Sequence, residues 1–272
     1  MKSNGANAKG TPNLLMSSLW LLLHTVFTWV EHLFRLLRRC RKAIYHIGLP
    51  GTAVETYRIK QSQQYVKSQL QTVSKIPTHL VVLLGLERPD YQRLSQFIHW
   101  SYAAGIAYIS FYDHNGTIKR NHEQIKRCVD ETPLADKHNI RWSDQNHDSI
   151  DMDRGPANRK CTFVSFLSPE DGKQGLVRLS RAIGESVLRR DLFPSDLSIE
   201  FLDNRLQSSS GYVPDPDLAV YFGEVCSAYG LLPWQIRLTE FLRLEWRLKD
   251  SNEYHFVDCL LRFAKCEQRL GS

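Results

Sequence analysis

Four runs of apolar residues, each as long as a β-strand, most constrain how this chain of 272 residues can fold. They cover residues 79–84, 106–111, 161–167 and 217–221. The run at 79–84 is continuously apolar after His79, which is typical of a strand that a parallel sheet buries on both faces. Helices are predicted at 54–75, 90–104, 118–137, 174–190, 234–246 and 254–268, and a further short strand at 199–202. The alternation predicts an α/β fold in which helices flank a mainly parallel central sheet.

The first 53 residues differ in composition and are predicted to attach the chain to a membrane. Residues 13–30 include no Asp, Glu, Lys or Arg, and a helix of that length spans about 27 Å, close to the thickness of a bilayer core. Basic residues follow between 35 and 42, so the positive-inside rule places the remainder of the chain in the cytosol. We therefore expect a tail at 1–12, a membrane anchor helix at 13–34, and a basic juxtamembrane segment with a linker at 35–53.

A polar stripe leaves a second arrangement open for this helix. Five polar residues recur at helical spacing along one side of it, namely Ser17, His24, Thr28, Glu31 and Arg35. With such a stripe the helix could instead lie in the membrane interface, with its basic end on anionic headgroups. Both arrangements attach the protein to a membrane.

Charge and cysteine usage exclude several classes of function. The net charge is +6, but the excess of basic residues is confined to residues 1–50, and 51–272 is balanced. This distribution argues against nucleic-acid binding. The 6 cysteines include no Cys-x-x-Cys pair, so a zinc site and a disulfide framework both lack the spacing that they need. Reduced thiols in a domain that faces the cytosol are the expected state.

Three motifs in the last sixty residues resemble those of the cis-prenyltransferase family. They are Pro214-Asp215-Pro216-Asp217-Leu218, Leu232-Pro233-Trp234-Gln235 and the terminal Arg269-Leu270-Gly271-Ser272. The resemblance covers residues 76–272 and, within the family, is strongest to its non-catalytic partner subunits. It implies a cis-prenyltransferase-like domain over 54–272 that ends in an Arg-x-Gly tail.

The resemblance breaks at three positions that carry catalysis in other members. Gly85 occupies the position of the aspartate that holds Mg²⁺, and a glycine has no side chain to coordinate a metal. The segment from Tyr112 lacks the serine and glutamate that follow the second strand in catalytic members. Tyr221 replaces an arginine that holds isopentenyl diphosphate, and a tyrosine cannot make a bidentate contact with phosphate. The resemblance thus implies no catalytic residue and no metal site in this chain alone.

Three acidic or titratable residues near these breaks leave other interpretations open. Glu87 follows Gly85 by two positions and could in principle replace the missing metal ligand. Asp113 and His114 are adjacent and could act as acid and base, but turn residues at the end of a strand are the favoured interpretation.

The C-terminal tail keeps the family's functional residues. The resemblance implies that Arg269 and Gly271, with Leu270 packed between them, reach across a dimer interface and contact isopentenyl diphosphate in the partner's active site. An arginine fork suits a diphosphate, and a cation there would stabilise charge that develops on the leaving group. A solvated terminus whose arginine interacts with the dipole of the preceding helix is the alternative.

The resemblance implies an accessory, non-catalytic subunit of the heteromeric dehydrodolichyl diphosphate synthase at the endoplasmic reticulum membrane. Its partner would be a catalytic cis-prenyltransferase subunit, in a heterodimer or higher heteromer, that binds Mg²⁺ and condenses isopentenyl diphosphate onto farnesyl diphosphate. That reaction leads to dolichol for protein glycosylation. Isopentenyl diphosphate and membrane lipid are the other expected partners, and nucleic acid is not expected.

Two further hypotheses and one expected interface complete the predictions. The chain could be a membrane receptor or scaffold without a role in prenyl synthesis, or an independently active homodimeric synthase that uses Glu87 for metal. The partner interface is expected in the C-terminal third, among the apolar residues Leu231, Leu232, Trp234, Ile236, Leu238, Phe241, Leu242 and Leu244.

Overall fold

The computed structural model describes residues 20, 22–31, 52–132, 138–143, 161–210 and 213–266, which belong to two units, Met1–Val54 and Glu55–Ser272. In the first unit, residues 22–31 form a helix that exposes Leu22, Phe27 and Trp29. Within the described ranges, no helix combines the length and the apolar character that crossing a bilayer requires. Residues 13–19, 21 and 32–34 of the predicted anchor lie outside those ranges.

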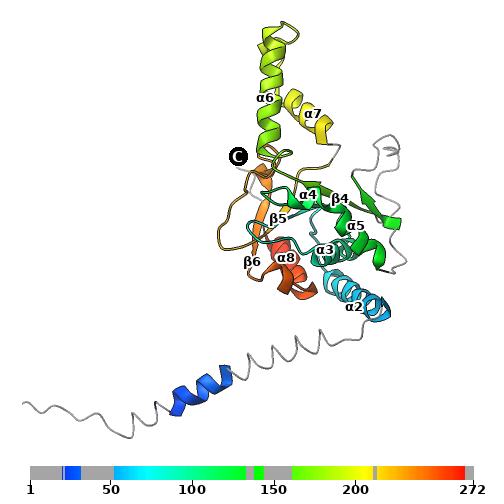
Figure 1. Ribbon diagram of the computed structural model, residues 1–272, viewed down its shortest axis with the longest axis vertical. Coiled ribbons are helices and arrows are strands. Elements are labelled where there is room, and N and C mark those ends of the chain that lie inside the picture. Colours follow the sequence, from blue (N-terminus) through cyan, green and yellow to red (C-terminus); the bar gives the residue numbers. More distant parts are fainter. Residues whose placement is uncertain are drawn as a thin grey trace, which may run out of the picture. The chain divides into compact units, whose positions relative to one another are not determined.

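In the second unit strands and helices alternate along the chain, as the sequence predicts (Figure 1). The strands are β1 (His79–Leu83), β2 (Tyr108–Tyr112), β3 (Ile140–Trp142), β4 (Thr162–Leu167), β5 (Leu218–Phe222) and β6 (Glu240–Leu244). The helices are α2 (Thr52–Leu70), α3 (Tyr91–Ala104), α4 (Thr117–Arg120), α5 (His122–Glu131), α6 (Lys173–Leu188), α7 (Ile199–Ser210) and α8 (Glu253–Lys265), with short 3-10 helices η3 (Pro194–Asp196), η4 (Ile236–Leu238) and η5 (Leu248–Asp250).

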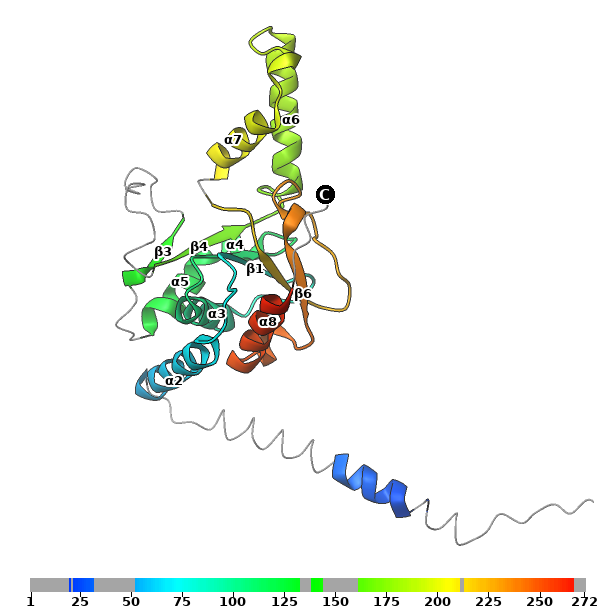
Figure 2. The same cartoon turned by 180° about the vertical axis from the view of Figure 1, so that it is seen from behind.

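The six strands form one sheet in the order β3-β4-β2-β1-β5-β6, and every neighbouring pair is parallel. Figure 2 shows β3 and β6 toward opposite ends of this sheet. β1 lies in the middle, with Val81 opposite Ser110 of β2 on one side and opposite Ala219 of β5 on the other. The predicted parallel α/β fold is therefore confirmed.

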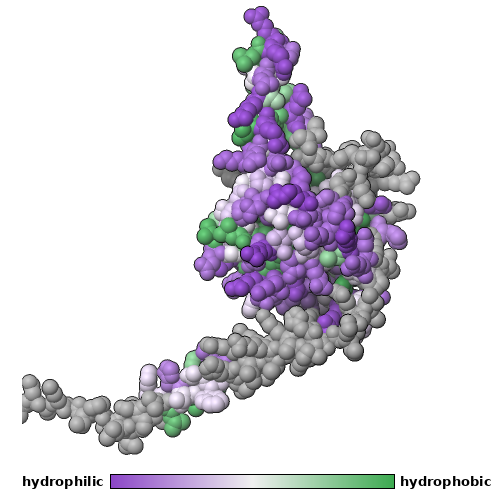
Figure 3. All heavy atoms as spheres, in the orientation of Figure 1, coloured by the Kyte–Doolittle hydropathy of each residue, from purple (hydrophilic) through white to green (hydrophobic). Residues whose placement is uncertain are grey.

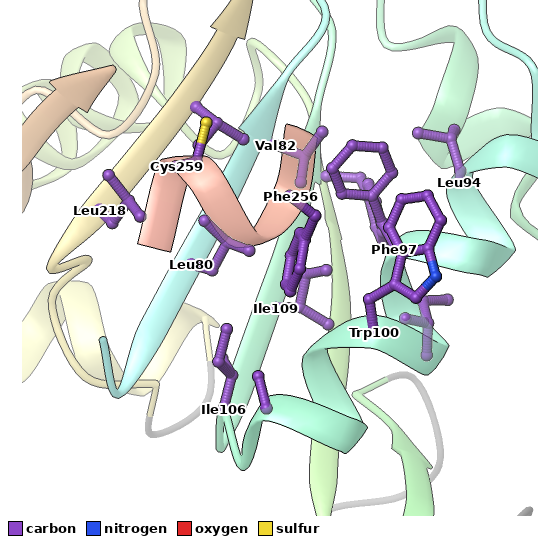
Figure 4. Packing of buried hydrophobic residues seen from close by; sticks show 14 of the residues in the cluster. Leu80, Val82, Leu94, Phe97, Trp100, Ile106, Ile109, Leu218, Phe256 and Cys259 are labelled. Carbon is purple, nitrogen blue, oxygen red and sulfur yellow. The ribbon is translucent and has the colours of Figure 1, made fainter. Parts of the chain in front are cut away.

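One face of the sheet carries the main core. Leu80 and Val82 of β1 pack with Phe97 and Trp100 of α3 and with Phe256 of α8 (Figure 4). The rings of Phe97 and Phe256 meet edge to face, with their centroids 5.9 Å apart. The central strands are continuously apolar because α3, α5 and α8 cover this face while a second cluster around Val81 and Leu83 covers the other.

The ends of α3 illustrate how local sequence sets these elements. Asp90 accepts a hydrogen bond from the backbone nitrogen of Arg93 at 3.0 Å, as an N-cap should. Gly105 ends the helix with φ of +82°, a left-handed conformation that glycine adopts without strain. Inside the helix, Trp100 donates to Ser62 Oγ of α2 at 3.2 Å, which joins the two helices.

The helix predicted at 234–246 is wrong, because this segment forms η4 and then the edge strand β6. β6 pairs with β5 from Glu240 opposite Leu218 to Leu244 opposite Phe222. Phe241 joins the cluster around Val81, whereas Leu244 joins the main core on the other face. Apolar residues at 238, 241, 242 and 244 fit the spacing of a helix and of a strand alike, so pairing with β5 decides the outcome.

The short strand predicted at 199–202 is also wrong, since α7 begins at Ile199. Ser198 Oγ accepts a hydrogen bond from the backbone nitrogen of Phe201 at 3.1 Å, which is the N-cap signal that the apolar pattern obscured. The helix predicted at 118–137 is divided into α4 and α5, and α5 ends at Glu131. The three-residue strand β3 was not predicted.

Candidate functional site

The carboxyl end of β1 is where a sheet of this topology forms a ligand site. From β1 the chain crosses to β2 on one side, and it later returns to β5 on the other. Ligands of open α/β sheets bind at such a switch point, just outside the carboxyl ends of the strands. Gly85 lies there, two residues after β1 ends.

Gly85 cannot carry any side chain in this structure. Its φ is +60°, and a Cβ built on it would lie 2.9 Å from the carbonyl oxygen of Phe222 and 3.4 Å from the ring of Tyr229. The first distance is shorter than real Cβ contacts, and it involves backbone that cannot swing away. The space that an aspartate side chain would need is therefore filled by the chain itself.

Phe222 is the last residue of β5, whereas Tyr229 belongs to the loop that follows this strand. Two hydrogen bonds hold this loop in place. Tyr112 Oη of β2 donates to the carbonyl oxygen of Tyr229 at 2.6 Å. The backbone nitrogen of Lys173 donates to the carbonyl oxygen of Gly230 at 2.9 Å. Burial, reinforced by two nearby carboxylates, raises the pKa of Tyr112 to about 12, so its hydroxyl remains a donor. We call residues 228–232 the plug loop.

Asp113 and His114 are turn residues, as predicted. Asp113 is buried, and its two carboxylate oxygens accept from the backbone nitrogens of Thr117 and Ile118 at 2.8 and 2.9 Å. His114 Nδ1 lies 2.7 Å from the carbonyl oxygen of Gly85 and so must donate to it. Both side chains hold backbone in place, and no acid–base pair is formed.

The side chain of Glu87 also has a structural role. Its Oε2 accepts from the backbone nitrogen of Leu248 at 2.7 Å, which ties the loop after β1 to η5. Over the residues that the structure describes, no group of three or more His, Cys, Asp or Glu side chains could hold a metal ion. The arrangement around Gly85 does not fit Mg²⁺, and Glu87 does not replace the missing ligand.

Tyr221 lies within β5 and is almost wholly buried. A hydrogen bond with the side chain of Cys226, together with burial, raises the pKa of its phenol. This position is part of the cluster around Val81 and Leu83 and offers no cation to a diphosphate.

A cavity of about 430 Å³ remains over the face of β1, β2 and β4, and a polar seam forms part of its lining. His79 Nδ1 lies 2.7 Å from the carbonyl oxygen of Pro214, and its Nε2 lies 2.7 Å from Ser110 Oγ. Ser110 Oγ in turn lies 2.5 Å from Ser165 Oγ. The sequence-based predictions do not include this seam, although His79, Ser110 and Ser165 are polar residues within strands that are otherwise mostly apolar.

The predicted diphosphate-binding residues Arg269, Leu270 and Gly271 lie outside the described residues, so their roles stay predictions. Of the apolar residues predicted for the partner interface, Leu231 and Leu244 are buried within the domain, whereas Leu238 is exposed. The plug loop was also not foreseen, because its contact with Gly85 joins segments far apart in the sequence.

Sequence comparison shows which known proteins this chain is similar to. The chain is 37% identical over 210 residues to the dehydrodolichyl diphosphate synthase complex subunit Nus1 of Mus musculus, covering 75% of this chain and 69% of that protein. It is 36% identical over 205 residues to the human subunit of the same name, covering 74% of this chain and 69% of that protein. No protein-family model matches.

A solved structure shows the same fold. The lavandulyl diphosphate synthase of Lavandula x intermedia, determined with dimethylallyl diphosphate, superposes with a TM-score of 0.52 at 18% identity and covers 72% of this chain and 99% of its own. The sequence similarity confirms the resemblance to the non-catalytic subunit of cis-prenyltransferase complexes, the Nogo-B receptor, that the motifs indicate. The chain therefore belongs to the Nus1 family of dehydrodolichyl diphosphate synthase complex subunits.

Proposed function

We propose that this chain is the accessory, non-catalytic subunit of its synthase complex. The observation that carries the proposal is the site at Gly85, where the carbonyl oxygen of Phe222 and the plug-loop residue Tyr229 leave no room for a side chain. A catalytic cis-prenyltransferase partner would supply the Mg²⁺ site and condense isopentenyl diphosphate onto farnesyl diphosphate. This chain would then contribute to dolichol synthesis, and so to protein glycosylation, only within the complex.

The C-terminal tail would complete the partner's active site. Arg269 offers a planar fork of donors to the diphosphate of isopentenyl diphosphate, and Gly271 allows close approach of the backbone. Preorganised cations at a leaving diphosphate stabilise the charge that develops there in the transition state. Leu270 would pack between the two.

The α6–α7 hairpin is the surface that we assign to the catalytic partner. α6 has no buried residue, and both views show α6 projecting from the rest of the second unit (Figures 1 and 2). Five apolar residues on the hairpin are exposed, namely Val177, Leu188, Phe193, Leu197 and Ile199. Figure 3 shows such residues interspersed with hydrophilic ones along the projection. Five exposed apolar side chains on an element that packs little against its own domain are the support for assigning this surface to the partner.

The proposal for the N-terminal segment is attachment to the endoplasmic reticulum membrane with the second unit in the cytosol. Its support is the uncharged stretch 13–30, the basic residues after it, and the exposed apolar side chains of residues 22–31. Flotation with lipid vesicles tests this: the full chain should float, and a chain that begins at residue 55 should not.

Reconstitution tests the accessory role. Incorporation of labelled isopentenyl diphosphate with Mg²⁺ is measured for this chain alone, for the catalytic subunit alone, and for the two co-expressed. We expect strong synthesis only in the pair. Arg269→Ala should then reduce synthesis by about a hundredfold, the usual cost of losing one transition-state contact, while the complex stays assembled.

Two outcomes would contradict the proposal. Synthesis that does not depend on this chain would favour a receptor or scaffold. Full activity of the Arg269→Ala complex would remove the role of the tail.

A further inference from the structure

The first helix of the α6–α7 hairpin starts on the plug loop. No residue of α6 is buried, so the direction of this helix depends on the contacts at its foot. At the first residue of α6, the backbone nitrogen of Lys173 donates to the carbonyl oxygen of Gly230 in the plug loop at 2.9 Å. The loop that packs against Gly85 therefore also carries the start of the hairpin.

Gly172, the residue before α6, packs against the plug loop backbone to backbone. A Cβ built on Gly172 would lie 2.0 Å from the carbonyl oxygen of Gly230 and 3.2 Å from the backbone nitrogen of Leu232. The first distance is far shorter than real Cβ contacts. A Cβ built on Gly184, within α6, would meet nothing within 4 Å. Close contact with the plug loop therefore requires glycine at position 172 but not at position 184.

The plug loop has an unusual backbone that its surroundings hold in place. Tyr229 and Leu232 have φ of +48° and +26°, which residues with a Cβ seldom adopt. The hydrogen bond from Tyr112 holds the carbonyl of Tyr229, and Leu232 is buried in the cluster around Val81. Such a backbone persists only where the surrounding contacts outweigh its strain. Without the contact from Tyr112, the loop could relax and the foot of α6 would move with it.

The second helix of the hairpin is tied to the same part of the chain. Trp234, two residues beyond the plug loop, donates from Nε1 to Asp203 Oδ1 of α7. The turn before α6 has a further support, because both carboxylate oxygens of Asp171 accept from Lys119 Nζ of α4, at 2.6 and 2.7 Å. Residues 228–234 thus contact both helices of the hairpin, whereas Lys119 braces only the turn before α6.

We propose that the plug loop sets the direction of the α6–α7 hairpin for the catalytic partner, with Tyr112 as a positioning residue. The inference rests on the proposed role of the hairpin in assembly. Tyr112 is fully buried, so it cannot touch a partner and acts through the carbonyl of Tyr229. The packing that leaves no room for a side chain at Gly85 thereby also supports the partner's binding surface.

Affinity for the catalytic subunit is the first test, measured by titration with the full chain. Gly172→Ala should raise Kd by at least about fivefold, because the start of α6 must move away from the plug loop. Tyr112→Phe keeps the ring and removes one hydrogen bond, so it should raise Kd by about twofold to tenfold. Gly184→Ala is the matched control, since the same substitution there meets no neighbour and should leave Kd unchanged.

A distance measurement separates a change of direction from a loss of stability. Spin labels on unnatural amino acids replace Asp191 on the hairpin and Lys67 on α2, both exposed, and electron resonance gives the distance between them in the free chain. Gly172→Ala and Tyr112→Phe should shift or broaden this distance distribution, whereas Gly184→Ala should not. A role in stability alone would lower the unfolding free energy and leave the distribution unchanged.

The outcomes distinguish this inference from the assignment of the hairpin to the partner. Unchanged distances in Gly172→Ala and Tyr112→Phe would overturn the inference, even if binding were weaker. Shifted distances with unchanged Kd would also overturn it, provided that Leu188→Glu with Phe193→Glu weakens binding. If that pair leaves Kd unchanged, the hairpin is not the partner's surface, and the proposed assignment fails instead.

Discussion

Gly85 both lacks a side chain and leaves no room for one at the carboxyl end of β1. Losing a carboxylate removes a metal ligand, but a later substitution could restore one if the space remained. Here the carbonyl oxygen of Phe222 and the ring of Tyr229 occupy that space, and Tyr112 fixes the loop that carries Tyr229. The loss is therefore built into the packing as well as into the sequence.

A pair of glycine substitutions measures this packing. Gly105 also has positive φ, but nothing lies within 4 Å of where its Cβ would be. Gly105→Ala should cost about 1 kcal/mol of unfolding free energy for backbone strain alone. Gly85→Ala should cost about 1–3 kcal/mol more, because it also overpacks the site. Urea unfolding of both variants measures the difference, and equal costs would show that the backbone at Phe222 shifts to make room.

The same packing predicts that the metal site cannot be restored by one change. Gly85→Asp should be destabilised at least as much as Gly85→Ala, and it should gain no Mg²⁺-dependent prenyl synthesis when assayed without a partner. Measurable turnover by the purified variant would contradict the structure described here.

At the scale of elements, the polar seam joins three strands. The carbonyl of Pro214 can only accept, so His79 Nδ1 carries the proton, and a neutral ring then accepts from Ser110 at Nε2. Ser110 can accept from Ser165 in turn. Burial lowers the pKa of His79 from 6.5 to about 4, in keeping with this neutral state.

The seam makes stability depend on pH with a definite sign. The unfolded state binds a proton near pH 6.5 and the native state only near pH 4, so stability is complete above pH 6.5 and falls as the pH drops toward 4. The loss at His79 amounts to at most about 3 kcal/mol. His79→Gln should make the decline in unfolding free energy shallower, whereas His138→Gln, at an exposed histidine, should not. Parallel profiles for all three proteins would show that His79 is not the group responsible.

The sequence predicts a helix or strand most reliably where the spacing of its apolar residues fits only one of the two. The runs that became β1, β2 and β5 are buried on both faces apart from Tyr108, which suits a strand inside a parallel sheet, and β4 alternates between buried and half-buried residues, the period of a strand. The segments at 234–246 and 199–202 were misassigned because their apolar spacing suits helix and strand alike. There the deciding interactions are pairing with β5 and a cap by Ser198, which periodicity does not report.

The candidate site, too, could be predicted from the sequence only in part. A glycine at position 85 excludes a carboxylate ligand on chemistry alone, so that part could be predicted. The plug loop could not, because its shape depends on positive φ at Tyr229, Gly230 and Leu232 and on a hydrogen bond from Tyr112. Such contacts join segments more than a hundred residues apart and exist only once the sheet has formed.

For the molecule as a whole, the main question is what covers the α6–α7 hairpin. A chain that folded for itself alone would gain nothing from placing Leu188 and Phe193, 85% and 60% exposed, on a projecting element. A subunit of a complex gains an interface, because large apolar side chains supply most of the binding energy at such contacts.

Charged substitutions on the hairpin should therefore separate assembly from folding. Leu188→Glu with Phe193→Glu should leave the unfolding free energy of the isolated chain within about 0.5 kcal/mol, because both side chains are exposed. The same pair should weaken binding to the catalytic subunit by at least about tenfold in Kd, since apolar contacts would be replaced by desolvated charges. Tyr57→Glu, 67% exposed on α2, controls for adding charge elsewhere on the surface. Unchanged affinity, measured by titration of the purified subunits, would mean that the partner binds another face and that the hairpin is covered by something else.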